Sequence, residues 1–373
     1  MKNKLQGCLI GAAVGDSLGL PYEGMSSSTG KKLFGIPDKH KLLFGLGMVS
    51  DDTEHLIIVL RAFRKAKGNL NLFSKRLALE LKIWTLALPL GAGKASLLSG
   101  LKLLIGFSSK SSGIFSAGNA PAMRVSVLGL LCNNTIKLKN YVKRATFISH
   151  TDAKAYRGAL AIAVAANMAG KSKKIDPKLF LKRFRKINNS KCKEFDKLLH
   201  KTAQSVKSKQ STQSFAKDLG LIKGVSGYSY HTVPVALHAW LSNQKNFRVG
   251  LMNTIKCGGD TDTVGSIVGS LIGIQVGAEN ISENWRKGIF DYPLNEKSLK
   301  EINLILLVFI KFFIKSSIFI FSHKSKFSNK DAIIQSYDWY VQNRESILSN
   351  TSTNSIHKST VKQGVLSLVG RLL

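Results

Sequence analysis

The chain has 373 residues, of which 44% are hydrophobic, and its 55 lysines and arginines against 22 aspartates and glutamates give a net charge of +33. This hydrophobic fraction excludes a wholly disordered chain, while the charge favours attraction to polyanions such as nucleic acid or an anionic membrane. The lysines are scattered, however, and no aromatic-basic nucleic-acid motif accompanies them, so most are interpreted as solvated surface.

The N-terminal twenty residues begin with lysines and continue into an apolar stretch, as a secretion signal does. Asp16 interrupts that stretch, so we interpret it as a helix of the mature protein. Glycines recur every fourth residue from Gly7 to Gly19, and again from Gly265 to Gly277. On a helix this spacing places small residues on one side, where a second helix can approach closely. Since strand patterns are scarce, we expect an all-α fold.

Three further segments have the start signals of helices. Residues 51–63 begin with Asp51 as a candidate cap and Glu54 three positions later. Residues 119–131 open with Asn119 and Pro121, because proline is tolerated in a first helical turn.

The third segment, residues 149–170, opens with cap residues and ends on glycine. The lysine-rich stretch 171–223 is expected to form surface helices and loops between the core elements.

The segment "CGGDTDTVGSIVGS", residues 257–270, places two aspartates one residue apart before an uncharged run. The two glycines permit a sharp turn, and in an extended segment Asp260 and Asp262 can point the same way. Both carboxylates would then converge just before a helix that begins near Thr263. An ordinary helix cap with an acid in the first turn is the alternative, and it explains one aspartate better than two.

Two other segments repeat this acidic pattern: "SDDTE" at 50–54, and "GDSLGLPYEG" at 15–24 with Asp16 and Glu23. Two like charges 4 Å apart repel by about 4 kcal/mol at an effective dielectric of 20, so a shared site would require raised pKa values or bound cations. Oxygen ligands select the hard cations Mg²⁺, Ca²⁺ or Mn²⁺. The carboxylates that would meet are Glu23, Asp51, Asp52, Asp260 and Asp262.

Six motifs in order, from "GCLIGAAVGDSLGLPYEG" through "SDDTE", "GNAPAMRVSVLGL", "SHTDAKAYRGALA" and "SGYSYHTVPVAL" to "CGGDTDTVGSIVGSLIG", resemble the ADP-ribosylglycohydrolase family over residues 5–291. The resemblance implies an all-α orthogonal helical bundle with a binuclear Mg²⁺ centre, in which Mn²⁺ is also possible. Glu23 would belong to a mobile loop that approaches the metals. The implied metal ligands are Ser50, Asp51, Asp52, Asp260, Asp262 and Thr263.

The same resemblance implies ADP-ribose as the ligand. The loop from Gly118 through Asn119 to Arg124 would follow the distal ribose and diphosphate, although Arg124 could instead stabilise local acids. His150 and Asp152 would lie near the ribose, with a hydrogen-bonded core histidine as the alternative for His150. Tyr228 would stack on the adenosine part or simply pack.

The implied activity is hydrolysis of the bond between ADP-ribose and an acceptor, with Glu23 and Asp262 as candidate catalytic carboxylates. The partner would be an ADP-ribosylated protein or a small conjugate. Two alternatives remain: an inactive ADP-ribose-binding or structural member of the family, and a hydrolase acting on ADP-ribosylated nucleic acid. Ala120 and Pro121 replace the glycine-rich pair more usual after Asn119, which stiffens this loop.

We assign residues 1–296 to this domain and residues 297–373 to a basic, partly amphipathic C-terminal extension. Residues 301–322 are apolar with one polar stripe, which favours a helix packed on the domain or lying on a membrane surface over one that spans it. The polar residues 350–360 are expected to be a linker. The four cysteines are dispersed and form no CxxC pair, so we expect neither a zinc site nor disulfides, as in a cytoplasmic protein.

Overall fold

The computed structural model describes residues 1–301, apart from 43–44, 88, 90–91, 190–191 and 292–293. Within these residues every secondary-structure element is a helix except for one pair of two-residue strands, which confirms the all-α prediction. The predicted amphipathic segment 301–322 and linker 350–360 fall outside the described residues, apart from Glu301. None of the described helices is long and apolar enough to cross a membrane.

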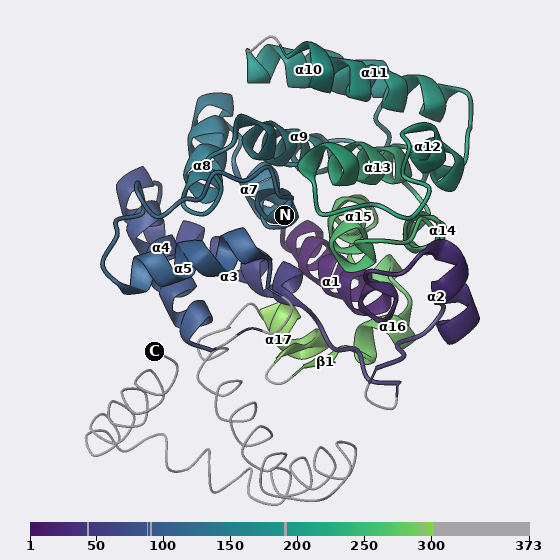
Figure 1. Ribbon diagram of the computed structural model, residues 1–373, viewed down its shortest axis with the longest axis horizontal. Coiled ribbons are helices and arrows are strands. Elements are labelled where there is room, and N and C mark those ends of the chain that lie inside the picture. The colour runs from purple at the N-terminus through teal and green to yellow at the C-terminus, as the bar shows by residue number, and fades with distance from the viewer. Residues whose placement is uncertain (43–44, 88, 90–91, 190–191, 292–293, 302–373) are drawn as a thin grey trace, which may run out of the picture. The chain divides into compact units, whose positions relative to one another are not determined.

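The two glycine-rich helices form the centre of the domain (Figure 1). Helices from both halves of the chain surround them, with α4, α5 and α8 on one side and α10 to α12 on the other. The central pair and its neighbours are α1 (Lys2–Gly19), α15 (Thr261–Val276), α3 (Asp51–Ala66), α6 (Ala120–Met123), α7 (Ser126–Leu131), α9 (Ala153–Ala169), α13 (Ser229–Ser242) and α14 (Phe247–Ile255).

The outer elements complete the domain. The hairpin of β1 and β2 is antiparallel, with Phe290 opposite Asn295. The remaining helices and strands are η1 (Leu20–Tyr22), α2 (Ser27–Phe34), α4 (Leu70–Leu86), α5 (Lys94–Leu104), α8 (Thr135–Phe147), α10 (Pro177–Asn188), α11 (Lys193–Lys207), α12 (Thr212–Asp218), η3 (Ala278–Asn280), α16 (Glu283–Lys287), β1 (Phe290–Asp291), β2 (Leu294–Asn295) and α17 (Glu296–Glu301).

The glycine spacing produces the close helix contact that the sequence predicts. A Cβ atom placed on Gly11 would lie 2.2 Å from the carbonyl oxygen of Gly269, and one on Gly15 would lie 2.1 Å from that of Gly265. These distances are far below any real carbon–oxygen contact, so α1 and α15 touch backbone to backbone. Each glycine lowers helix propensity by about 1 kcal/mol relative to alanine, and the close packing of the pair is the compensating gain.

Three predicted helix boundaries need correction. Ser50, not Asp51, caps α3, because the Ser50 hydroxyl accepts a hydrogen bond from the Asp52 amide at 3.2 Å. The segment 119–131 forms two short helices, since Arg124 and Val125 both have ψ near 0° and interrupt the helical hydrogen bonds. Helix α15 begins at Thr261, two residues before the predicted start.

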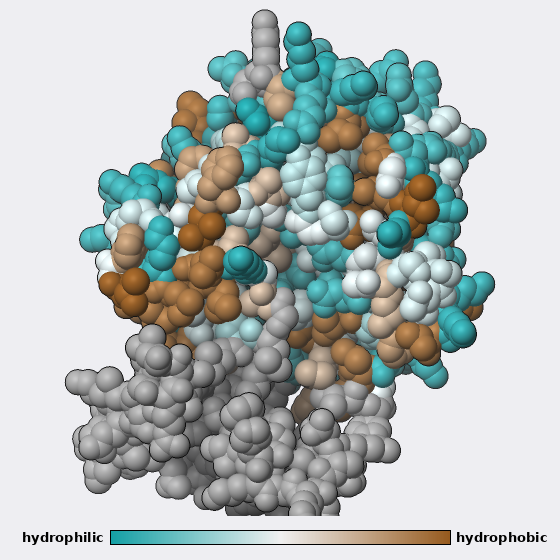
Figure 2. Space-filling view, viewed as in Figure 1, coloured by the Kyte–Doolittle hydropathy of each residue, from teal (hydrophilic) through white to brown (hydrophobic). Residues whose placement is uncertain are grey.

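The lysine-rich stretch forms the surface helices α10, α11 and α12, as predicted. Figure 2 shows mainly hydrophilic side chains toward the top of the molecule, where α10 and α11 lie. It shows hydrophobic surface over α4 and α5, which expose Leu79, Leu86, Leu98 and Leu101.

Candidate metal centre and cleft

A cleft of about 560 Å³ opens where the N-terminal ends of α3, α6 and α15 meet. Four carboxylates line it: Glu23, Asp51, Asp260 and Asp262. Its volume is within the range of about 300 to 1,000 Å³ that is usual for small-molecule sites. Segments separated by more than 230 residues in the chain therefore supply one acidic surface.

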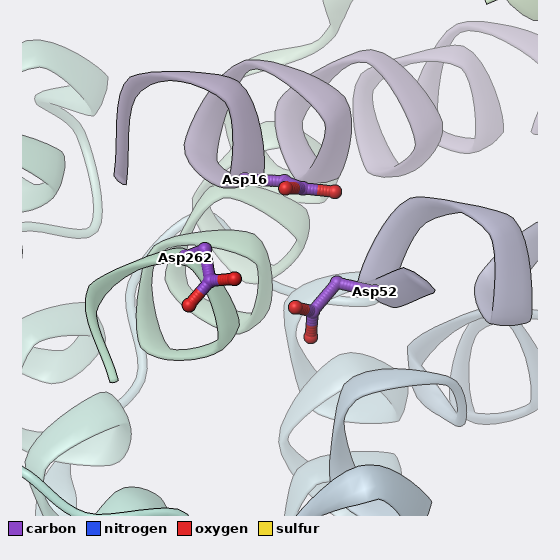
Figure 3. Close-up of side chains that lie close together, drawn as sticks. All are labelled: Asp16, Asp52 and Asp262. Atoms are coloured by element: carbon purple, nitrogen blue, oxygen red, sulfur yellow. The ribbon is translucent and has the colours of Figure 1, made fainter. Parts of the chain in front are cut away.

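Beneath this surface, three buried aspartates from three helices come together. Each of Asp16, Asp52 and Asp262 offers a carboxylate oxygen, and these oxygens lie within 4.8 Å of one another. Figure 3 shows the three side chains pointing into a common space from α1, α3 and α15. The close approach of α1 and α15 accounts for this arrangement, because Asp16 follows Gly15 directly and Asp262 lies one turn before Gly265.

The Asp16 carboxylate anchors the start of α3. It accepts hydrogen bonds at 3.0 Å from the Ser50 amide, at 3.1 Å from the Thr53 amide and at 2.5 Å from the Thr53 hydroxyl. Two amides that have no partner inside the helix are thereby satisfied. Sequence reasoning noted Asp16 in its motif but assigned it no site role. The available signal was its position at the end of the glycine-rich helix.

Asp52 and Asp262 differ from Asp16, because each has a buried carboxylate oxygen without a hydrogen-bond partner, Oδ1 in both cases. The other oxygen of Asp52 accepts hydrogen bonds from the Ser50 hydroxyl at 3.0 Å and the Thr263 hydroxyl at 3.1 Å. Both predicted hydroxyl ligands thus contact the same aspartate. A buried charged oxygen without a partner is strongly unfavourable, so these atoms call for a cation or a proton.

The electrostatics of the aspartates agree with this requirement. Burial raises the pKa of Asp16 to about 7. Burial, followed by the charges of Glu54, Asp16 and Asp260, raises the pKa of Asp51 to about 8. The pKa values of Asp52 and Asp262 are raised well above the ordinary value, again chiefly by burial. A divalent cation would reverse these shifts, and an all-oxygen donor set suits Mg²⁺ or Mn²⁺. The residues present therefore fit such an ion.

Asp260 is held at the edge of the cleft by an amide side chain. It is the residue before α15, but its carboxylate makes no capping hydrogen bond to that helix. Instead, Asn119 Nδ2 donates to Asp260 Oδ2 at 2.6 Å and also contacts the Thr232 hydroxyl at 2.9 Å. The plain helix-cap alternative for Asp260 is thus not what the structure shows.

Glu23 follows η1, on a loop that is joined to the Gly258–Gly259 turn. The amide of Gly24 donates to the Gly259 carbonyl at 2.8 Å, and the amide of Gly259 donates to the Met25 carbonyl at 2.7 Å. Gly259 has φ +80°, and a Cβ atom there would lie 2.0 Å from the Val225 carbonyl oxygen. Burial, and then the charge of Asp260, raises the pKa of Glu23. The turn therefore places Glu23 beside the aspartates.

Of the residues predicted to bind substrate, Gly118, Asn119 and His150 line the cleft. A Cβ atom on Gly118 would lie 3.0 Å from His150 Nε2, so the missing side chain keeps this wall open. His150 Nδ1 and the Ser149 hydroxyl are 2.9 Å apart, and the ring is buried. His150 is thus a hydrogen-bonded core histidine that also lines the cleft, and its place near a ribose stays a prediction.

Arg124, Asp152 and Tyr228 are not among the residues that line the cleft. Arg124 is fully buried, and its guanidinium contacts His55 Nδ1 at 3.1 Å and the Ser149 hydroxyl. Burial lowers the pKa of Arg124 to about 10, while the charge of Asp51 opposes that shift. This placement favours the predicted role beside local acids over the predicted phosphate contact.

Asp152 and Tyr228 have structural partners elsewhere. Asp152 caps α9 by accepting from the Lys154 amide at 2.7 Å. The Tyr228 hydroxyl accepts from the Lys154 ammonium at 2.8 Å, and its ring packs edge-on against His231. Most cleft residues without a predicted role lie at the start of α5, Gly93–Ser96, and on the loop 223–227, and Ser116 is a further one. Ser226 and Gly227 open the family motif "SGYSYHTVPVAL", whereas the other residues of these two segments belong to no motif that indicates chemistry.

The fold and the cleft define a class of protein, an all-α domain with a buried cluster of three aspartates beneath an acidic cleft, at the converging ends of its central helices. The chain belongs to the ADP-ribosylglycohydrolase family, whose model matches residues 1–308. This confirms the family resemblance and assigns the chain to a family of glycosidic-bond hydrolases.

Individual relatives agree with this assignment. An uncharacterised protein of Archaeoglobus fulgidus is 27% identical over 309 residues, which cover 80% of this chain and 95% of that protein. A solved structure described as an ADP-ribosylglycohydrolase-related protein complex matches with a TM-score of 0.60 at 19% identity, covering 81% of this chain and 95% of that one. At this identity the solved structure supports the fold alone.

Proposed function

We propose that this protein is a divalent-cation-dependent hydrolase that cleaves the bond between ADP-ribose and an acceptor. The observation that carries the proposal is the pair of buried, unpartnered Oδ1 atoms of Asp52 and Asp262 beneath a cleft of about 560 Å³. Family membership supplies the class of substrate. The residues that would hold two Mg²⁺ or Mn²⁺ ions are Ser50, Asp51, Asp52, Asp260, Asp262 and Thr263, together with Asp16.

Bound divalent cations supply Lewis acidity and lower the pKa of a water molecule, which is the chemistry that hydrolysis needs. The protein's own residues prepare the site for it. Asn119 fixes the orientation of Asp260, and Asp16 fixes the end of α3 that carries Asp51 and Asp52. Gly118 leaves room for a ligand beside His150.

Glu23 is our candidate for proton transfer. Its carboxylate lines the cleft, and its pKa is raised by burial and by Asp260. A carboxyl group with a raised pKa can take a proton from a hydrolytic water or give one to a leaving group near neutral pH. Asp262 is the second candidate, and it would share this role with cation binding. The acceptor, whether a protein side chain or a small conjugate, would lie toward the open end of the cleft.

The test is a panel of ADP-ribose conjugates linked through arginine, serine, an O-acetyl ester and a nucleic-acid terminus, each incubated with Mg²⁺ and with Mn²⁺. We expect release of ADP-ribose from at least one conjugate and its loss in excess chelator. The double substitution Asp52→Asn/Asp262→Asn should lower turnover by at least about 10³-fold and abolish Mn²⁺ binding measured by calorimetry.

Glu283→Gln is the matched control, since it removes an exposed carboxylate that does not line the cleft. Unchanged turnover in chelator would contradict the proposal. If ADP-ribose raised the melting temperature and no conjugate were hydrolysed, the protein would instead be a binding module. A bound ligand at 100 times its dissociation constant stabilises the fold by about 2.7 kcal/mol.

A further inference from the structure

A second cavity, of about 660 Å³, lies between α2, α12 and the turn that leads into α15. It is separate from the acidic cleft, although the segment 23–28, which leads into the first turn of α2, contributes to both. Glu23 and Gly24, at the start of this segment, line the cleft, and Ser26–Ser28, at its end, line the second cavity. The two cavities therefore lie on opposite ends of one short segment.

The charge of the second cavity is opposite to that of the cleft. Lys31, Lys217 and Lys256 line it, and no aspartate or glutamate is among its described lining residues. All three lysines are exposed, and none has a described carboxylate within 4.0 Å. Three uncompensated cations around one concave surface create a local positive potential that attracts anions.

The remainder of the cavity offers hydroxyl groups and apolar surface. Gln213 Nε2 donates to the Ser27 hydroxyl at 3.0 Å and to the Lys256 carbonyl at 3.1 Å, which ties α12 to α2 and to the end of α14. Ile36 and Ile222 line the cavity with exposed fractions of 54% and 74%. Isoleucines left so exposed beside lysines provide a surface on which the apolar part of an anionic ligand can pack.

We propose that this cavity binds an organic phosphate: the phosphate group contacts the three lysines and the serine hydroxyls, and an apolar body such as a nucleobase packs on the isoleucines. Charge-assisted hydrogen bonds from ammonium groups to phosphate are among the stronger polar contacts in proteins. The volume of the cavity is sufficient for a nucleotide. The proposal concerns binding and does not depend on the hydrolase activity.

The experiment is calorimetric titration of the full chain with ADP, in excess chelator and at low salt. Without divalent cations the carboxylates of the cleft disfavour an anion, so binding reports mainly on the second cavity. We expect saturable binding that weakens at least about tenfold in Lys31→Ala/Lys217→Ala/Lys256→Ala. The matched control is Lys178→Ala/Lys182→Ala/Lys186→Ala, which removes three exposed lysines from α10 and should leave the affinity nearly unchanged.

Two further arms separate the possible sources of binding. Asp52→Asn/Asp262→Asn should retain ADP binding, since the cleft is not the site; loss of binding there would overturn the proposal. Inorganic pyrophosphate and adenosine should each bind more weakly than ADP, and pyrophosphate binding as tightly as ADP would refute the apolar contact. Equal weakening in both lysine triples would indicate a diffuse basic surface, and no saturation by about 1 mM ADP would also overturn the proposal.

Discussion

The central helix pair has two regions of opposite character. Along most of their length α1 and α15 meet glycine against glycine, with spacing so close that no side chain fits. At one end the same two helices contribute Asp16 and Asp262 to a buried acidic cluster. The glycine region stabilises the fold through dense packing, whereas the acidic region opposes folding unless it is neutralised. The packed glycine region therefore holds the electrostatically unfavourable acidic region in place.

The contact between α1 and α15 explains how three buried aspartates can stay close together. Asp16, Asp52 and Asp262 are buried, and their repulsion would push the helix ends apart if those ends could move. Backbone contact between α1 and α15 leaves little freedom for such movement. The packing of the helices therefore organises the cluster by itself, and under the proposed function this would reduce the entropy lost when a cation binds.

The largest expected effect is a pH dependence of stability in the metal-free protein. The pKa of Asp16 is raised to about 7 and that of Asp51 to about 8. An unfolded aspartate has a pKa of about 4, so the folded state binds more protons than the unfolded state from about pH 4 to about pH 8. Their stabilising contribution is complete below about pH 4 and is lost as pH rises to about 8. In chelator, urea denaturation should show the free energy of unfolding falling by on the order of several kcal/mol across this window.

Saturating Mg²⁺ is the control for that experiment. The cation takes the place of the protons, so the dependence on pH should flatten between pH 6 and pH 8 on the pKa values of about 7 and about 8. Stability in chelator that rises through this window would contradict the assigned sign.

The next effect concerns the glycine region alone. Gly11→Ala should lower the free energy of unfolding by about 3 kcal/mol, since the new Cβ would lie 2.2 Å from the Gly269 carbonyl oxygen and force the helices apart. This loss should outweigh the gain of about 1 kcal/mol in helix propensity. Gly93→Ala is the matched control, because its Cβ would meet nothing within 4 Å and its φ is −59°. Equal stability of the two variants would refute the packing argument.

The sequence predicted the glycine region more completely than the acidic one. A four-residue repeat is enough to place small residues on one helix side, whichever helix packs there. The acidic motifs likewise predicted that Asp51, Asp52, Asp260 and Asp262 meet. Asp16 was not assigned, because its partners lie at Ser50 and Thr53, more than 30 residues away, and only the folded chain brings them together.

Side-chain direction was the other missing information. Arg124 ends a four-residue helix, which is too short for an apolar stripe to reveal the side that faces the core. Its guanidinium points inward to His55 and Ser149. Asp152 and Tyr228 belong to motifs of the family, but both accept hydrogen bonds from Lys154, Asp152 from its amide and Tyr228 from its ammonium group. A motif thus located the segments correctly without fixing which of their side chains reach the cleft.

In the acidic region we expect a substitution that raises stability, by less than Gly11→Ala lowers it. In chelator, Asp262→Asn should raise the free energy of unfolding by about 1 to 2 kcal/mol, because it removes a carboxyl group whose ionised form is disfavoured by burial and by the neighbouring carboxylates. The same variant should lose Mn²⁺ affinity, so stability and cation binding would change in opposite directions. Denaturation with and without Mn²⁺ measures both. A variant that is less stable than the parent in chelator would mean that Asp262 supports the fold directly.

The smallest effect concerns the Ser50 hydroxyl, which contributes both to the packed scaffold and to the acidic region. Ser50 caps α3 and also donates to Asp52 Oδ2, so Ser50→Ala should lower the free energy of unfolding by about 1 kcal/mol. Without this donor the Asp52 carboxylate is less well oriented, and Mn²⁺ affinity should fall by about tenfold. Ser50→Thr keeps the hydroxyl and should preserve both quantities. If Ser50→Ala changed stability without changing affinity, Ser50 would belong to the packed scaffold alone, and the boundary between the two regions would lie at Asp51.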